Sequence, residues 1–556
     1  MVISVSVPNR SGMSAFPTTF ALQQDNWNDY NFQTLYHLYY NSGGAAAPPT
    51  LIGGVKILRR GQTKLDGLQV SQAFERLDDR YCSVGTSLDY YQRLNEIPAD
   101  QREEILSALR DVVAHPTLTA EFSAEPGWRT SLFRDNPDPS AFLDDAAAIY
   151  KNKLGDVADI GQVLTFRPAN WNVPVILNFD APFSPFAMFA APAPGIGQVN
   201  VGLPRRVIAI VGRNGSGKST LLSRIARVAY SAPSDRLRHE IASIGVFDPL
   251  TIGFLKIIAI SYSAFDNFIV PGIYETELQQ IANDIEKGSG RYIYAGLRDI
   301  VAEVRDDIAN AASKVFAPGE RARLESGDRR TTTKLKSLEQ LAEEFERLIT
   351  QIVANNDEVL FDEALLLLLA DPSFADIETQ ARLELIGSDP RSAFLSWSTG
   401  HKIALHVVAS LVAHCTRKSI VLFDEPETHL HPPLIAALMH SVRLVLERKN
   451  AFAIVATHSP VILQETLARH VRIIRRNGDI FDVLSPGIET FGENVGALTY
   501  DTFGLTAASS DFYRVLDWLI AAHSTLDQIN HLFSPSLSGQ ALSYVLAGLA
   551  RKAQQP

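Results

Sequence analysis

Residues 207–219 read VIAIVGRNGSGKS, and this stretch decides the fold of the chain. An unbroken apolar run ends at a glycine-rich loop, and the helix-forming sequence LLSRIARVAY comes directly afterwards. Unbroken apolar runs are typical of parallel strands that are buried on both faces. The stretch therefore predicts a buried strand, a phosphate-binding loop and a helix in direct succession, in the pattern G-x-x-x-x-G-K-[ST].

The loop carries the groups that a triphosphate requires. Glycines let successive backbone N–H groups curl around the phosphates, and the helix N-terminus adds a favourable dipole. Lys218 adds a positive charge, and the Ser219 hydroxyl is a ligand for Mg²⁺. ATP and Mg²⁺ are therefore the expected cofactors. The residues predicted to hold the nucleotide are Gly212, Arg213, Asn214, Gly215, Ser216, Gly217, Lys218, Ser219 and Thr220.

Two further apolar runs end in residues suited to phosphate chemistry. The run IVLF at 420–423 is followed by Asp424, which can hold magnesium beside Ser219, and by Glu425, which can polarise the attacking water. The run AFAIVAT at 451–457 is followed by His458, whose imidazole can contact the γ-phosphate. We predict Glu425, His458 and Lys218 as catalytic residues and Ser219 and Asp424 as metal ligands.

A fourth motif precedes the apolar helix-forming sequence IALHVVASLVAH. Ser398 is the expected N-cap of that helix. Its hydroxyl, the Gly400 N–H group and the positive helix end together form a candidate anion site.

The order of these motifs resembles the ATP-binding cassette superfamily, in its branch of SMC-like, RecF-like and overcoming-lysosome-like (AAA_21-type) ATPases. The resemblance covers residues 163–503 and includes the stretch DEPETHLHP at 424–432. It implies an α/β fold with an ABC-type P-loop ATPase head. It also implies that Ser398 and Gly400 touch the γ-phosphate bound to a second copy, in a homodimer or a higher homo-oligomer.

Two features depart from the superfamily pattern. The region where the superfamily places a magnesium-contacting Gln contains none, and Asp266 or Ser263 is the candidate replacement. His401 and Trp397 stand where the superfamily usually has Gln and Leu. These departures leave the transmission of the nucleotide state and the engagement of a second copy open.

Three stretches are similar to the PtuA ATPase of Septu-type and retron-associated antiphage systems: ETFGENVG at 489–496, residues 261–263, and YIYAGLR at 292–298. This resemblance implies an HNH nuclease as a separate effector in antiphage defence. A RecF-like DNA-binding repair or recombination ATPase is the alternative. A module that holds ATP without turnover also stays open, because the Gln is missing.

The chain is expected to contain five regions. Residues 17–58 predict paired strands around a loop, and the pattern is helical from Leu68 to about Val113. Residues 338–352 predict a helix with one apolar face, in a segment that projects or forms a lid. The regions are an N-terminal α+β accessory domain (1–155), a first ATPase part (156–300), a helical lid or insertion (301–390), a second ATPase part (391–505) and C-terminal helices (506–556).

The amino-acid composition limits the kinds of partner that the chain is expected to bind. A net charge of -11 argues against a surface that binds nucleic acid everywhere. No apolar run reaches the length of a membrane span, and the two cysteines suit a reducing compartment, so we expect a cytoplasmic protein without a membrane partner. Local contacts with nucleic acid stay possible at two basic patches. These are Arg321, Arg323, Arg329, Arg330, Lys334 and Lys336, and Arg469, Arg472, Arg475 and Arg476.

Overall fold

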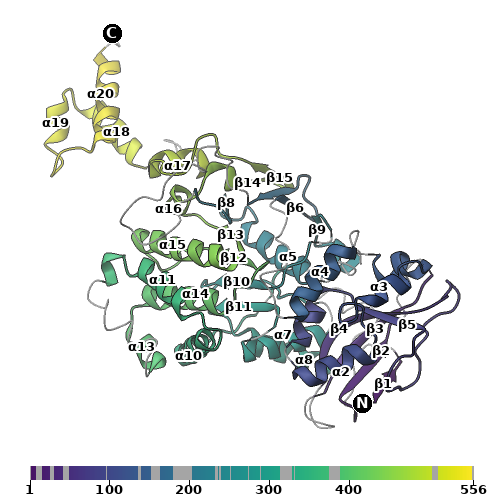
Figure 1. Ribbon diagram of the computed structural model, residues 1–556. Coiled ribbons are helices and arrows are strands. Elements are labelled where there is room, and N and C mark those ends of the chain that lie inside the picture. Colours follow the sequence, from purple (N-terminus) through teal and green to yellow (C-terminus); the bar gives the residue numbers. More distant parts are fainter. Residues whose placement is uncertain are drawn as a thin grey trace, which may run out of the picture.

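The computed structural model describes most of the chain (Figure 1). The described residues are 2–7, 16–25, 31–41, 49–95, 97–134, 139–151, 163–179, 203–231, 236, 239–250, 252–272, 275–288, 290–313, 328–330, 332–374, 389–503 and 511–553.

A seven-stranded sheet forms the centre of the molecule, with the strand order β11-β10-β12-β13-β8-β14-β15. Its strands run parallel except for β15, which pairs antiparallel with β14. The carboxyl ends of β8, β12 and β13 therefore meet at one edge, where open α/β sheets bind ligands. The strands are β8 (Val207–Gly212), β10 (Ile257–Ser261), β11 (Tyr292–Gly296), β12 (Ile420–Asp424), β13 (Phe452–Ala456), β14 (Val471–Asn477) and β15 (Ile480–Leu484).

Both faces of this sheet are buried, as the unbroken apolar runs predict. Within β12, Val421 and Phe423 join one hydrophobic core, whereas Ile420 and Leu422 join the other. The first core is covered by α10 (Leu338–Ala354), α11 (Glu358–Leu368), α13 (Pro390–Ser396), α14 (Thr399–His414) and α15 (Pro432–Lys449). The second core is covered by α5 (Lys218–Tyr230), α6 (His239–Ala242), α7 (Glu275–Lys287), α8 (Ile300–Ser313) and a small sheet of β7 (Val175–Asn178), β6 (Val163–Pro168) and β9 (Gly245–Asp248). The α/β fold class predicted from the sequence is confirmed.

Shorter helices complete the head. They are η5 (Pro372–Phe374), α16 (Pro460–Gln464), η6 (Ala468–His470) and α17 (Val495–Phe503). Leu463 of α16 and Leu498 of α17 pack with Ala209 and Val211 of β8, so these helices support the strand that leads into the glycine-rich loop.

The described helices α10 and α11 of the insertion between β11 and β12 pack within the head. The sequence predicts a projecting segment or a lid at 301–390, but Phe345 of α10 and Phe361 of α11 lie in the core that α14 and α15 share. The apolar face of α10 is used for packing inside the head, so α10 and α11 do not project, and the lid stays a prediction. A capping box of Ser337 and Gln340 starts α10.

The N-terminal region is an α+β domain around a five-stranded sheet in the order β1-β2-β3-β4-β5. Its strands are β1 (Ile3–Ser6), β2 (Phe20–Gln24), β3 (Leu35–Tyr40), β4 (Thr50–Arg59) and β5 (Tyr81–Gly85). Its helices are α1 (Leu88–Leu94), α2 (Ala99–Ala108), α3 (Thr117–Phe122), η2 (Trp128–Leu132) and α4 (Pro139–Tyr150). The strands predicted at 17–58 are confirmed, since β2, β3 and β4 pair antiparallel.

The helical pattern predicted from Leu68 to Val113 is wrong for its first part, because residues 68–80 contain no helix and the first helix begins at Leu88. Residues Tyr81–Gly85 form a strand that pairs with β4. Four of its five residues are buried, so the strand shows no polar–apolar alternation that would reveal it in the sequence.

Ion pairs join the N-terminal domain to the head. Arg93 of α1 lies 3.3 Å from Asp284 of α7, and both side chains are almost completely buried. Asp145 of α4 lies 2.6 Å from Lys418, in the turn before β12. The two domains are therefore in direct contact, and they lie side by side in Figure 1.

The C-terminal helices extend away from the head, at the upper left of Figure 1. They are α18 (Asp511–Ala522), α19 (Leu526–Asn530) and α20 (Gly539–Ala553). Leu516, Leu519 and Val545 are buried in a small core of their own, but Phe512 and Val515 are each 46% exposed, so the apolar stripe of α18 is only partly packed. Among the helices that the structure describes, none is long and apolar enough to cross a membrane.

Candidate nucleotide-binding site

The glycine-rich loop joins β8 to α5 in the predicted way. Gly217 is the N-cap of α5 and has a φ of 99°, a left-handed conformation that favours glycine. A Cβ atom at Gly212 would lie 2.4 Å from the Ile474 carbonyl oxygen, so a side chain does not fit there. The Ser216 hydroxyl is buried and has no hydrogen-bond partner among the described residues. The loop therefore offers its backbone and one hydroxyl group without a described partner, and this arrangement suits an anionic ligand.

Lys218 lies at the start of α5 and is almost fully buried. Its Nζ donates to the Gly212 carbonyl at 3.1 Å and lies 2.6 Å from His458 Nε2. Burial lowers the pKa of Lys218, although nearby carboxylates oppose the shift. Burial, together with the charge on Lys218, lowers the pKa of His458 to about 4. At neutral pH, His458 is therefore an uncharged imidazole that accepts a hydrogen bond from the Lys218 ammonium group.

Ser219 and Asp424 come together as predicted metal ligands should. The Ser219 hydroxyl donates to Asp424 Oδ1 at 2.9 Å. Burial raises the pKa of Asp424 to about 7, and the charges of Glu425 and Asp266 contribute. Within the described segments no cluster of three or more His, Cys, Asp or Glu side chains could hold a metal. Mg²⁺ suits this site because it usually takes one or two carboxylates together with waters and substrate phosphates.

Glu425 follows β12 and faces the same site. Its φ of 48° is left-handed, and its backbone N–H donates to the Ala456 carbonyl at 2.8 Å. His458 Nε2 lies 3.8 Å from Glu425 Oε1. The three residues predicted as catalytic thus converge at the carboxyl edge of the sheet, although they come from three different strand ends.

Ser398 caps α14 as the sequence predicts, because its Oγ accepts from the His401 N–H at 3.4 Å. A Cβ atom at Gly400 would lie 3.1 Å from the His429 carbonyl oxygen, so this turn packs closely against the loop after β12. His401 stacks on Phe374, with ring centroids 3.9 Å apart. No hydrogen bond or ion pair between described residues joins Ser398 or Gly400 to the Lys218 site. The structure does not bring these predicted residues to the nucleotide site of their own chain.

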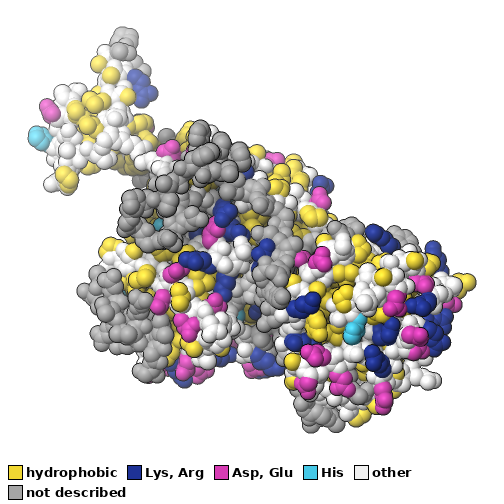
Figure 2. Space-filling view, in the orientation of Figure 1, with side chains coloured by type: hydrophobic (Ala, Val, Ile, Leu, Met, Phe, Trp, Pro, Cys, Tyr) yellow, Lys and Arg dark blue, Asp and Glu magenta, His cyan; other side chains and the backbone are white. Residues whose placement is uncertain are grey.

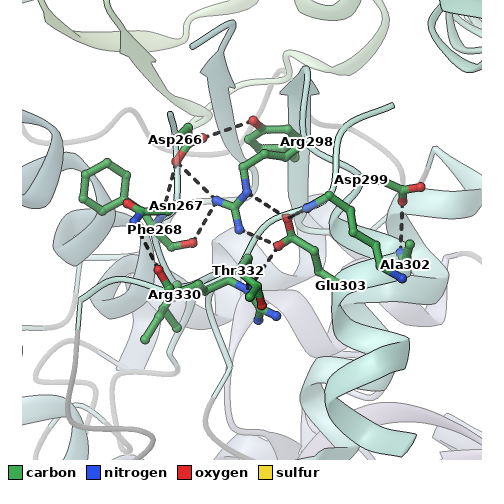
Figure 3. A network of polar contacts seen from close by, with 12 residues as sticks. Asp266, Asn267, Phe268, Arg298, Asp299, Ala302, Glu303, Arg330 and Thr332 are labelled. Atoms are coloured by element: carbon green, nitrogen blue, oxygen red, sulfur yellow. Dashed lines mark hydrogen bonds and ion pairs between the residues drawn. The ribbon is translucent and has the colours of Figure 1, made fainter. Parts of the chain in front are cut away.

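Asp266, a candidate replacement for the missing Gln, lines a cavity of about 50 Å³ together with Ser219 and Asp424. Its Oδ1 accepts from Arg298 Nη1 at 3.2 Å, and Arg298 Nη2 also donates to Glu303 at 2.6 Å. Figure 3 shows Arg298 between these two carboxylates. The Asp266 carboxylate is therefore held by an ion pair at the rim of the metal site. Ser263, the other candidate, does not line this cavity.

Two aromatic residues that the sequence analysis missed flank the loop. Trp171, between β6 and β7, stacks on Phe481 of β15 with ring centroids 4.4 Å apart. A Cβ atom at Gly217 would lie 3.5 Å from Phe481 and 3.6 Å from Trp171. The Arg476 guanidinium lies 5.2 Å from the centre of the Phe481 ring. The sequence gives no signal for this pair, because the two residues are far apart along the chain and neither lies in a motif.

Three of the four described residues of the first basic patch form ion pairs. Arg330, Lys334 and Lys336 all contact carboxylates, and Arg329 lies over the Phe268 ring. The carboxylates are Glu303 and Asp307 for Arg330, Asp306 for Lys334 and Glu344 for Lys336. Arg321 and Arg323 lie outside the described residues.

The second basic patch is only partly engaged in contacts within the chain. Arg472 donates to the carbonyl groups of Ile176, Arg469 and Val471, whereas the side chains of Arg469, Arg475 and Arg476 are exposed. On the face shown in Figure 2, basic and acidic side chains of the N-terminal domain are interspersed, so no broad basic surface appears there.

The sheet topology and the loop define a P-loop nucleotide-binding domain. Residues 207–464 match the family AAA_21, described as "AAA domain, putative AbiEii toxin, Type IV TA system". The match begins with β8 and ends with α16, so it includes all four motifs predicted from the sequence. This part of the chain is therefore similar to that family, and its sheet and loop are those of a P-loop nucleotide-binding domain.

Protein ea59 of Escherichia phage lambda is similar to nearly the whole chain. It is 27% identical in an alignment of 534 positions that covers 91% of this chain and 90% of that protein. The similarity therefore extends well beyond residues 207–464 into the rest of the chain.

Solved structures of ATPase heads are more distant. A structure of an Smc head bound to the C-terminal winged-helix domain of ScpA covers 59% of this chain and 97% of its own, at 13% identity and a TM-score of 0.25. An ATP-binding cassette of an ABC transporter in its ADP conformation covers 55% and 85%, at 12% identity and a TM-score of 0.22.

Proposed function

We propose that this chain is an ATPase that dimerises around ATP and uses its nucleotide state to regulate a partner effector. The observation that carries the proposal is the convergence of Lys218, His458 and Glu425. Lys218 Nζ lies 2.6 Å from His458 Nε2, which lies 3.8 Å from Glu425 Oε1. A cation for the phosphates, a neutral imidazole and a carboxylate for water activation are then within reach of one bound γ-phosphate.

The roles of the side chains follow from their positions. The loop N–H groups and Lys218 bind the phosphates, and Glu425 orients and polarises the attacking water. His458, with its pKa of about 4, stays neutral at physiological pH and exchanges its contact with Lys218 for one with the γ-phosphate. Ser219 and Asp424 would hold Mg²⁺, which neutralises phosphate charge when bound. The Trp171 and Phe481 rings beside Gly217 supply an apolar platform for the base.

A second copy completes the site in this proposal. Ser398 and Gly400 begin α14, which packs in the core opposite that of α5. The cap therefore presents an N–H group and a hydroxyl that suit an anion, without a contact to the nucleotide site of its own chain.

The Ser398→Trp variant tests this second copy. We expect it to bind ATP with unchanged affinity but to lose turnover, because a bulky side chain at the cap blocks the approach of the partner protomer. ATP turnover is measured in the Ser398→Trp variant. Sedimentation of the Glu425→Gln,Ser398→Trp double variant measures whether two protomers still associate. If binding and turnover fall together, Ser398 is only a structural cap of α14.

The effector in this proposal is an HNH nuclease, and the setting is antiphage defence in the cytoplasm. The proposal rests on the resemblance to PtuA-type ATPases. The alternative, a RecF-like DNA-binding ATPase, is favoured by the exposed arginines on β14.

Two measurements separate these functions. Co-purification with a nuclease that is silent alone supports the effector proposal. Duplex DNA binding by the isolated chain that weakens steeply with salt, and that disappears when Arg469, Arg475 and Arg476 are changed to Ala, supports the alternative.

A further inference from the structure

Glu427 connects the loop after β12 to the loop after β13. Its Oε1 accepts a hydrogen bond from the backbone N–H of His458, and its Oε2 accepts one from the Thr457 hydroxyl at 2.9 Å. Thr457 is fully buried, and its Oγ1 in turn accepts from the Ser459 N–H at 2.9 Å. One carboxylate thus holds consecutive residues on both sides of the peptide bond that leads to His458.

This contact fixes the two loops relative to each other at the site. Asp424 and Ala456 are register partners at the ends of β12 and β13, and the Glu425 N–H donates to the Ala456 carbonyl at 2.8 Å. Beyond β13, the Thr457 N–H still donates to the Ile210 carbonyl of β8 at 3.0 Å, whereas the His458 N–H donates to the Glu427 side chain. The Glu427 carboxylate supplies the next connection and so sets the position of His458 relative to Glu425.

We propose that Glu427 is a positioning residue for hydrolysis, which acts by holding the His458 backbone. We call the contacts of Glu427 with Thr457 and His458 the Glu427 clamp. The inference rests on the proposed ATPase function. Glu427 makes no described hydrogen bond with Lys218 or the phosphate loop, although its charge helps to raise the pKa of Lys218 against the effect of burial. The positioning role is exerted through the His458 backbone.

The electrostatic setting agrees with this geometry. Burial raises the pKa of the Glu427 carboxyl, and the hydrogen bonds from His458 and Thr457 oppose that shift. The charged groups that face the His458 ring are Lys218 and Glu425. A clamp on the backbone keeps the ring beside Lys218, where its pKa is about 4.

A purely structural role is the competing explanation, and Glu489 provides a matched control. The Glu489 carboxylate accepts from the backbone N–H groups of Ala468, Thr490 and Phe491. It therefore fixes a loop in the same chemical way, but it contacts no residue of the nucleotide site.

The experiment compares Glu427→Ala, Glu427→Gln and Glu489→Ala in the full chain. ATP affinity, kcat and the pKa of His458 are measured, the last by NMR of labelled histidine with assignment through His458→Gln. For Glu427→Ala we expect unchanged ATP affinity, a kcat lower by about 10- to 100-fold, as for a catalytic group displaced by an ångström, and a His458 pKa that rises toward about 6.5.

Glu427→Gln should restore most of kcat, because the amide oxygen still accepts from the His458 N–H and the amide nitrogen can donate to the Thr457 hydroxyl. Glu489→Ala should leave all three quantities unchanged. Equal kcat losses in Glu427→Ala and Glu489→Ala, or a His458 pKa that stays at about 4 in Glu427→Ala, overturn the clamp. A wild-type chain that binds but never hydrolyses ATP contradicts the proposed function instead, and the His458 pKa still decides on the clamp.

Discussion

The Lys218→Ala variant is expected to lose ATP binding. Lys218 supplies the charge inside the phosphate cradle, and a hydrogen bond to a charged group contributes up to about 3 kcal/mol, or about 100-fold in Kd. Because Lys218 is buried and its pKa is lowered by that burial, its removal takes away a poorly solvated charge. The nucleotide-free variant should therefore keep its Tm, while the rise of Tm with ATP disappears.

Isothermal calorimetry and thermal unfolding with and without ATP measure this result. Lys449→Ala is the matched control, since Lys449 pairs with Asp357 at 2.6 Å at the end of α15 and has no described hydrogen bond or ion pair with the loop. The control should bind ATP normally. An unchanged ATP affinity in Lys218→Ala would refute the glycine-rich loop as the nucleotide site.

The sequence predicts the strand ends of this site well for a physical reason. Each of Lys218, Asp424 and His458 stands within a few residues of an apolar run, and such runs form parallel strands in one sheet. Parallel strands place their carboxyl ends at one edge, so the motifs meet without any knowledge of the loops between them. The order of the motifs along the chain therefore indicates which residues share the site.

Contacts between segments that are far apart in the sequence leave no pattern from which they can be predicted. Trp171 and Phe481 meet because the connection between β6 and β7 lies against β15, and the sequence shows no periodicity that links them. The apolar face of α10 indicates burial but not the partner, which is why a lid was expected where Phe345 packs inside the head. In the same way, the Asp266 carboxylate stands where a replacement for Gln is expected, but its partner Arg298 is found only in the structure.

The Glu425→Gln variant is expected to bind ATP and to trap it. Gln has the same size as Glu, and the left-handed backbone at φ 48° is held by the N–H bond to Ala456, which the substitution retains. The site geometry should therefore survive. The amide cannot accept a proton from the attacking water, and the loss of a general base costs about 10²- to 10⁴-fold in turnover.

Persisting ATP should also hold two protomers together, because in the proposed arrangement the nucleotide lies between them. Retained nucleotide is identified by chromatography after gel filtration, and protomer association by sedimentation. Glu465→Gln is the control, since Glu465 pairs with Arg443 outside the site and should leave turnover unchanged. Full turnover in Glu425→Gln removes Glu425 from the catalytic role. Trapped ATP on a monomer keeps that role but contradicts the shared site, because Ser398 of another copy would then be unnecessary for holding the phosphates.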